Sequence, residues 1–170
     1  ATERERGWLQ LKRASPAPAY GYVFAKMITT LLFASMALMP IYLIAAYFGG
    51  IELDRIAWVS LFGTHLLGTI PFVLIGLSLG FTLSAGGAVA VSNILFFALA
   101  ILGGLWFPVF IFPSIMQTLA SFTPSFHLAE LALAIVDAPG DHKTATNIIS
   151  IIGMTILLLA LTLWAWSRQR

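Results

Sequence analysis

Four long apolar segments alternate with short polar ones along the chain. Each contains about the 20 apolar residues that a helix needs to cross a bilayer core of about 30 Å. Because lipid offers the backbone no hydrogen-bond partner, such segments must satisfy their own N–H and C=O groups as helices. The pattern predicts transmembrane helices at about residues 23–48, 56–83, 88–112 and 147–166, the third broken by the two glycines and two prolines of "GGLWFPVFIFP". Pro40 lies inside the first of them and is expected to kink it.

The segment between the third and fourth predicted spans is too apolar for an ordinary loop and too interrupted for a full crossing. It contains two short amphipathic pieces hinged at Pro124, followed by the polar turn "DAPGDHK". Non-helical backbone at membrane depth is tolerated only where protein or water covers it. We therefore expect a re-entrant or interfacial helical hairpin at about residues 114–138. The predicted fold class is all-α, a polytopic membrane protein with four transmembrane helices.

Composition and charge agree with a membrane protein and predict its orientation. Hydrophobic residues make up 59% of the chain and charged residues 9%, and there is no cysteine, which excludes disulfides and thiolate chemistry. Lys and Arg gather on the cytoplasmic side of spans. One side holds two, Arg55 and Lys143, and the other holds seven: Arg4, Arg6, Lys12, Arg13, Lys26, Arg168 and Arg170. Both termini are thus expected in the cytoplasm and the hairpin outside, with no nucleic-acid partner.

The charge-rich residues 1–18 precede the first span. Thr2 and Glu5 have the spacing of a capping box, which predicts a short amphipathic helix from Glu3 to about Arg13, ending near "SPAP". A helix with an aromatic face and a mixed-charge face has two interpretations at this point. It can lie on the lipid headgroups as an anchor, or it can dock a cytoplasmic partner.

Two stretches resemble the ABC-2 type transporter permeases. "ERERGWLQLKRASPAPAYGYVFAK" is similar to that family's cytoplasmic coupling-helix segment, matching at Glu3, Arg4, Glu5, Arg6, Gly7, Leu9, Leu11, Ser15, Pro16 and Lys26. "GGLWFPVFIFPSIMQTLASFTPSFHLAELALAI" resembles the family's outer helical hairpin, matching at Gly103, Phe107, Pro108, Pro113, Pro124 and His127. The separation of the two stretches is the one that the family requires.

The resemblance implies a transmembrane permease subunit of an ATP-driven exporter in a bacterial or archaeal inner (plasma) membrane. Residues 1–18 would hold the coupling helix that docks a separate ABC ATPase, and residues 19–170 would be the last four of six spans. Further partners would be a second permease subunit, in a homodimer or heterodimer, and membrane lipid. ATP and Mg²⁺ would be bound by the ATPase, with no cofactor in this chain. The substrate would be an amphipathic drug, a lipid or a glycan.

The resemblance also assigns residues to two sites. The ATPase-docking residues would be Glu3, Arg4, Glu5, Arg6, Gly7, Trp8 and Leu11. The outer hairpin would be shaped by Phe107, Pro108, Pro113, Pro124 and His127, and the i, i+3 spacing of Glu130 from His127 adds Glu130 to the same candidate site.

Candidate chemistry is sparse. The chain has no P-loop, G-x-S-x-G or H-E-x-x-H motif, so we expect no catalytic residue and no enzyme activity in this chain. His65 is ionisable and lies inside the second span, where with Thr64 and Thr69 it could line a substrate path or simply bond to a neighbouring helix. Asn93, on the third span, could likewise face the path or form an interhelical hydrogen bond.

A last cluster of polar residues lies in and after the predicted hairpin: His127, Glu130, Asp137, Asp141 and His142. A catalytic metal would need three of them to converge with an open position, and we expect an outer gate or cap rather than a metal site. Two alternatives to the exporter are a stand-alone membrane enzyme that uses His127, Glu130, Asp137 and His142, and a membrane assembly protein.

Overall fold

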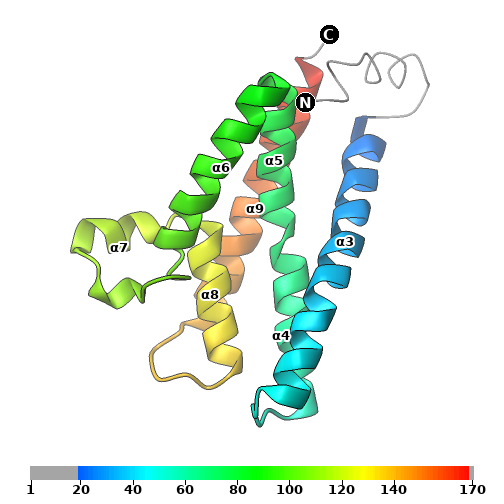
Figure 1. Ribbon diagram of the computed structural model, residues 1–170. Helices are drawn as coiled ribbons and strands as arrows, with labels where there is room; N and C mark the ends of the chain where they lie inside the picture. The colour runs from blue at the N-terminus through cyan, green and yellow to red at the C-terminus, as the bar shows by residue number, and fades with distance from the viewer. Residues whose placement is uncertain (1–18, 169–170) are drawn as a thin grey trace.

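The computed structural model describes residues 19–168, and the predicted coupling helix at residues 3–13 lies outside them. Figure 1 shows a bundle of long helices with one short helix standing to its side. The elements are α3 (Ala19–Phe48), α4 (Arg55–Gly68), α5 (Ile70–Thr82), α6 (Ala85–Leu102), the 3-10 helix η1 (Val109–Ile111), α7 (Ser114–Ala120), α8 (Pro124–Ile135) and α9 (Thr144–Ser167). No strand occurs among the described residues.

The helices confirm an all-α, polytopic membrane protein. Within residues 19–168, four helical stretches are long and apolar enough to cross a bilayer: Tyr20–Phe48, Arg55–Thr82, Ala85–Leu102 and Thr144–Ser167. Their outward side chains are also apolar. Phe33, Met36 and Ile94 are each at least 67% exposed, as suits a surface that meets lipid or other helices rather than water.

The second span is divided in the middle into α4 and α5. Pro71 lies in the first turn of α5, where the absence of its N–H is tolerated. Thr69 caps the preceding helix, because its N–H and its hydroxyl both donate to the Leu66 carbonyl, at 3.2 and 2.7 Å. The carbonyl at the break therefore has partners, as backbone at membrane depth requires.

The third span is shorter than the predicted residues 88–112. Helix α6 begins after Ser84, whose hydroxyl accepts from the Gly87 N–H, and it ends at Leu102. Gly104 then has a φ of +78°, a left-handed conformation that favours glycine, and Pro108 and Pro113 lack the N–H that a helix would need. Residues 103–113 therefore contain only η1, although their composition is as apolar as that of a span.

Helix α9 packs along α5 and α8, and α8 also contacts α4 and α6. Thr162 of α9 is fully buried against α5, with its hydroxyl oxygen 2.9 Å from Ser78 Oγ and 3.1 Å from the Leu74 carbonyl. Interhelical hydrogen bonds of this kind hold membrane helices together where the hydrophobic effect does not.

An aromatic cluster joins α3, α5 and α9 at the end of the bundle where α3 begins and α9 ends (Figure 1). Tyr22 of α3 stacks on Trp166 of α9 with ring centroids 4.9 Å apart, and Phe81 of α5 lies 5.2 Å from the same indole. Phe81 is 2% exposed. The first turn of α3 therefore packs against α5 and α9.

Gly103 sets the approach of α6 to α8, and its substitution tests this packing. A Cβ at Gly103 would lie 2.5 Å from Ser125 Cβ and 2.7 Å from the Leu99 carbonyl oxygen, whereas one at Gly76 would meet nothing within 4 Å. We expect Gly103→Ala to destabilise the fold by about 1–3 kcal/mol through overpacking. Thermal unfolding in detergent should show a lower midpoint for Gly103→Ala, with Gly76→Ala as the matched control. Equal midpoints for the two variants would contradict the observed packing.

Candidate functional site

Four polar side chains link α8, the loop after it and the first turn of α9, and we call them the hairpin junction: His127, Glu130, His142 and Asn147. Helix α8 begins at Pro124 because the Thr123 hydroxyl caps it by accepting from the Phe126 N–H, and proline is well tolerated at the first helical position. That start places His127 in the first turn of α8. His127 is 5% exposed and Asn147 is 4% exposed.

The hairpin junction is continuously hydrogen-bonded. His127 Nδ1 lies 2.7 Å from Asn147 Oδ1, and His127 Nε2 lies 2.9 Å from the carbonyl of Ser121 at the end of α7. The Asn147 amide Nδ2 donates to the His142 carbonyl. His142 Nδ1 in turn lies 2.9 Å from Glu130 Oε2, and its Nε2 lies 3.0 Å from the Ala138 carbonyl. These bonds tie the end of α7, the start of α9 and the α8–α9 loop to α8.

His142 lies in the loop, outside the spans, and its environment favours the charged imidazole. The hydrogen bond to the Glu130 carboxylate raises the pKa of His142 above its ordinary 6.5, with further contributions from the Ala138 carbonyl and the Asp141 charge, while burial opposes the shift. A raised pKa in the folded state means that the pair stabilises the fold fully below the ordinary value. That stability is lost as pH rises through the raised pKa.

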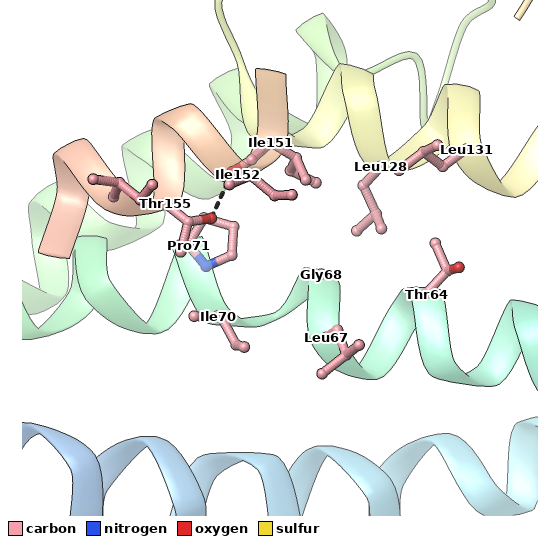
Figure 2. A pocket seen from close by; sticks show the side chains of 11 residues that line it. Thr64, Leu67, Gly68, Ile70, Pro71, Leu128, Leu131, Ile151, Ile152 and Thr155 are labelled. Atoms are coloured by element: carbon pink, nitrogen blue, oxygen red, sulfur yellow. Dashed lines mark hydrogen bonds between the residues drawn. The ribbon is translucent and has the colours of Figure 1, made fainter. Parts of the chain in front are cut away.

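A second feature is an apolar cavity of about 370 Å³ where α4 breaks (Figure 2). Its walls come from α4, α5, α8 and α9, and they include Leu67, Leu128 and Ile152. The Thr155 hydroxyl donates to the Ile151 carbonyl at 2.6 Å, the dashed line in Figure 2, so its hydrogen is used within α9. The cavity can accept hydrocarbon, and Thr64 and Thr155 are the polar side chains in its lining.

The residues predicted to line a substrate path do not converge. His65 Nδ1 lies 2.8 Å from the Tyr42 hydroxyl oxygen of α3 and 2.9 Å from the Leu61 carbonyl, so it bonds to a neighbouring helix, one of its two predicted roles. Thr64 lines the apolar cavity, whereas His65 lines a different one, beside Tyr42. Thr69 caps α4, and Asn93 is exposed on α6.

The residues predicted for the outer hairpin lie in two different places, the segment around η1 and α7 and the hairpin junction on α8. Phe107 is 54% exposed, and Pro108 and Pro113 precede η1 and α7. His127 and Glu130 lie instead in the hairpin junction. Figure 1 shows the same division, because α7 stands away from the bundle while α8 packs within it.

Of the five polar residues considered for a metal, only Glu130 and His142 contact each other. Asp141 instead lies 3.9 Å from the Lys143 ammonium. Within residues 19–168, no three His, Asp or Glu side chains are arranged to hold a metal ion. The predictions from sequence missed Asn147 and the Ser121 carbonyl. The signal for Asn147 was a lone amide in the first turn of an otherwise apolar span, where a buried partner is expected.

These features define a polytopic α-helical membrane protein with one interrupted span and a hairpin fixed by buried polar bonds. The chain belongs to the ABC-2 family of transporter proteins, whose family profile matches residues 1–166. It is also similar to the Bacillus subtilis (strain 168) protein named "Putative transport permease YvfS", with 29% identity over 167 residues, covering 98% of this chain and 67% of that protein. No solved structure matches the chain. The chain is therefore a transport permease of a family that in general works with an ABC ATPase.

Asn147 is the residue whose loss should weaken the hairpin junction most. Asn147→Ala leaves His127 Nδ1 and the His142 carbonyl without their present partners, and an unpaired buried polar group costs about 1–3 kcal/mol. We expect a lower unfolding midpoint in detergent for Asn147→Ala. Thr146→Ala, at the exposed neighbouring position of the same helix turn, is the control and should unfold like the unmodified protein. If both variants unfold alike, the junction does not stabilise the fold.

Proposed function

We propose that this chain belongs to the permease subunit of an ATP-driven exporter. A separate ABC ATPase binds and hydrolyses ATP with Mg²⁺, and the permease moves an amphipathic drug, a lipid or a glycan across the membrane. The proposal rests on the family match over residues 1–166. It is supported by the charged segment "ERERG" at residues 3–7, which lies on the N-terminal side of the first span.

Residues 3–13 are the docking element in this proposal, with Glu3, Arg4, Glu5 and Arg6 as its charged contacts. Movement of this segment would be passed to α3, whose first turns pack against α5 and α9 through Tyr22, Phe81 and Trp166. A displacement of α3 at this end would therefore shift two other spans. Coupling of this kind requires contacts that differ between two states of the complex.

A partner permease subunit and the substrate are also part of the proposal. The apolar faces of α3 and α6 are exposed over their lengths, and Asn93 lies on the exposed face of α6, where a second subunit would give the amide a hydrogen-bond partner. The apolar cavity beside α8 is consistent with a substrate that has a hydrocarbon part. Both termini are proposed to be cytoplasmic, from the excess of Lys and Arg on that side.

The docking role is tested by retention of the ATPase during purification from host membranes in detergent. We expect an ATPase subunit with a P-loop sequence to co-purify with the unmodified protein. The double variant Glu5→Ala, Arg6→Ala should retain it at least about tenfold less, because loss of interfacial charge pairs costs 2 kcal/mol or more.

The control is the double variant Glu52→Ala, Arg55→Ala, which removes one acidic and one basic residue at the opposite end of the first and second spans, where both are exposed. It should retain the ATPase fully. If the Glu5→Ala, Arg6→Ala variant also retains it fully, residues 3–13 are an interfacial anchor and not the docking element.

A further inference from the structure

The two histidines of the hairpin junction share an unusual arrangement, in which each ring lies between two acceptors. His127 Nδ1 faces Asn147 Oδ1, and its Nε2 faces the Ser121 carbonyl. A neutral imidazole has one N–H and can satisfy only one of these oxygens. The other would then face a ring lone pair in a buried site, which is unfavourable.

The orientation of Asn147 is fixed by its second bond. Its Nδ2 donates to the His142 carbonyl, which can only accept. Turning the amide over would give His127 a donor, but it would also bring two oxygens together at the His142 carbonyl. The amide oxygen therefore remains on the His127 side, and both acceptors around His127 require an N–H.

His142 repeats the arrangement in the loop. Its Nδ1 faces Glu130 Oε2 and its Nε2 faces the Ala138 carbonyl, so both ring nitrogens again meet acceptors. The Glu130 carboxylate also compensates the positive charge of a protonated ring. Only 12% of the His142 side chain is exposed.

We propose that the hairpin junction is a proton-binding site, in which protonation of His127 and His142 holds α7 and α8 against the start of α9. With both rings doubly protonated, every bond of the junction has a donor and an acceptor. When the protons leave, Ser121 or Asn147 loses its partner and the Glu130 contact loses its charge attraction. The hairpin then opens more readily, so the site links hairpin position to pH independently of ATPase docking.

The titratable and charged groups around the site come from few elements. Helices α6 and α7 carry none, and α9 carries none before Arg168. Glu130 is the charged residue of α8, and the loop adds Asp137, Asp141 and Lys143. Helix α4 supplies Arg55, which is exposed, and His65, which bonds to Tyr42. Protonation at the junction is therefore governed by Glu130 and the loop acids.

The chain has no cysteine, so a single introduced cysteine can report hairpin opening. Ala120→Cys places the thiol at a fully buried position at the end of α7, beside Ser121, and Leu119→Cys places it at a neighbouring position that is 52% exposed. The rate of modification by a small methanethiosulfonate is measured for each in detergent from pH 5 to pH 9. Dividing the two rates removes the part of the pH dependence that both thiols and the reagent share.

We expect the ratio of the Ala120→Cys rate to the Leu119→Cys rate to rise about tenfold with pH, as loss of one buried hydrogen bond allows. Adding His127→Gln and His142→Gln should make the ratio independent of pH, whereas adding His65→Gln should leave the rise unchanged. His142→Gln alone, a loop substitution that leaves the buried His127 in place, should reduce the rise. A flat ratio in the unmodified background, or a rise that persists without both histidines, would overturn the proposal.

Discussion

The structure depends on the requirement that every backbone N–H and C=O within the apolar region finds a partner inside the protein. Continuous helices meet it in α3 and α9, and the difficult places are where helices stop. At the α4–α5 break, Thr69 supplies the partners through its N–H and its hydroxyl. After α6, the turns at Gly104 and η1 give hydrogen-bond partners to the carbonyls of Ala100, Ile101, Pro108 and Val109. Both interruptions lie next to α8.

Helix α8 therefore fixes the positions of several other helices. It contacts α4, α6 and α9, and it carries the two residues of the junction that face the loop and α9, Glu130 and His127. Close approach on one side requires glycine, since a Cβ at Gly68 would lie 2.3 Å from Leu128 Cδ1 and one at Gly103 would meet Ser125. On the other side buried polar bonds fix its register. Such bonds specify one arrangement of helices where apolar packing alone would tolerate several.

The sequence predicted what depends on local composition and missed what depends on distant partners. The four spans follow from runs of apolar residues, and the family resemblance carried by "ERERG" and the Phe107–Pro108 stretch is confirmed by the family match. The third helix ends at Leu102 and not at residue 112, at the two glycines and two prolines of "GGLWFPVFIFP" that were expected to break it, so the span was placed correctly and its helical part was overestimated. The bond from His127 to Asn147 joins residues 20 positions apart on different helices, and no local pattern encodes it. Docking by residues 3–13 stays a prediction.

The central claim, that this permease is driven by an ABC ATPase docked at its first residues, is tested most directly by site-specific cross-linking in host membranes. A photoreactive amino acid replaces Trp8 in the proposed docking helix, or Phe48, which is 86% exposed at the far end of α3, as the control. The account predicts that the residue 8 probe forms an adduct with a protein that contains a P-loop sequence and that the residue 48 probe does not. Adducts of the residue 8 probe with lipid alone would contradict it.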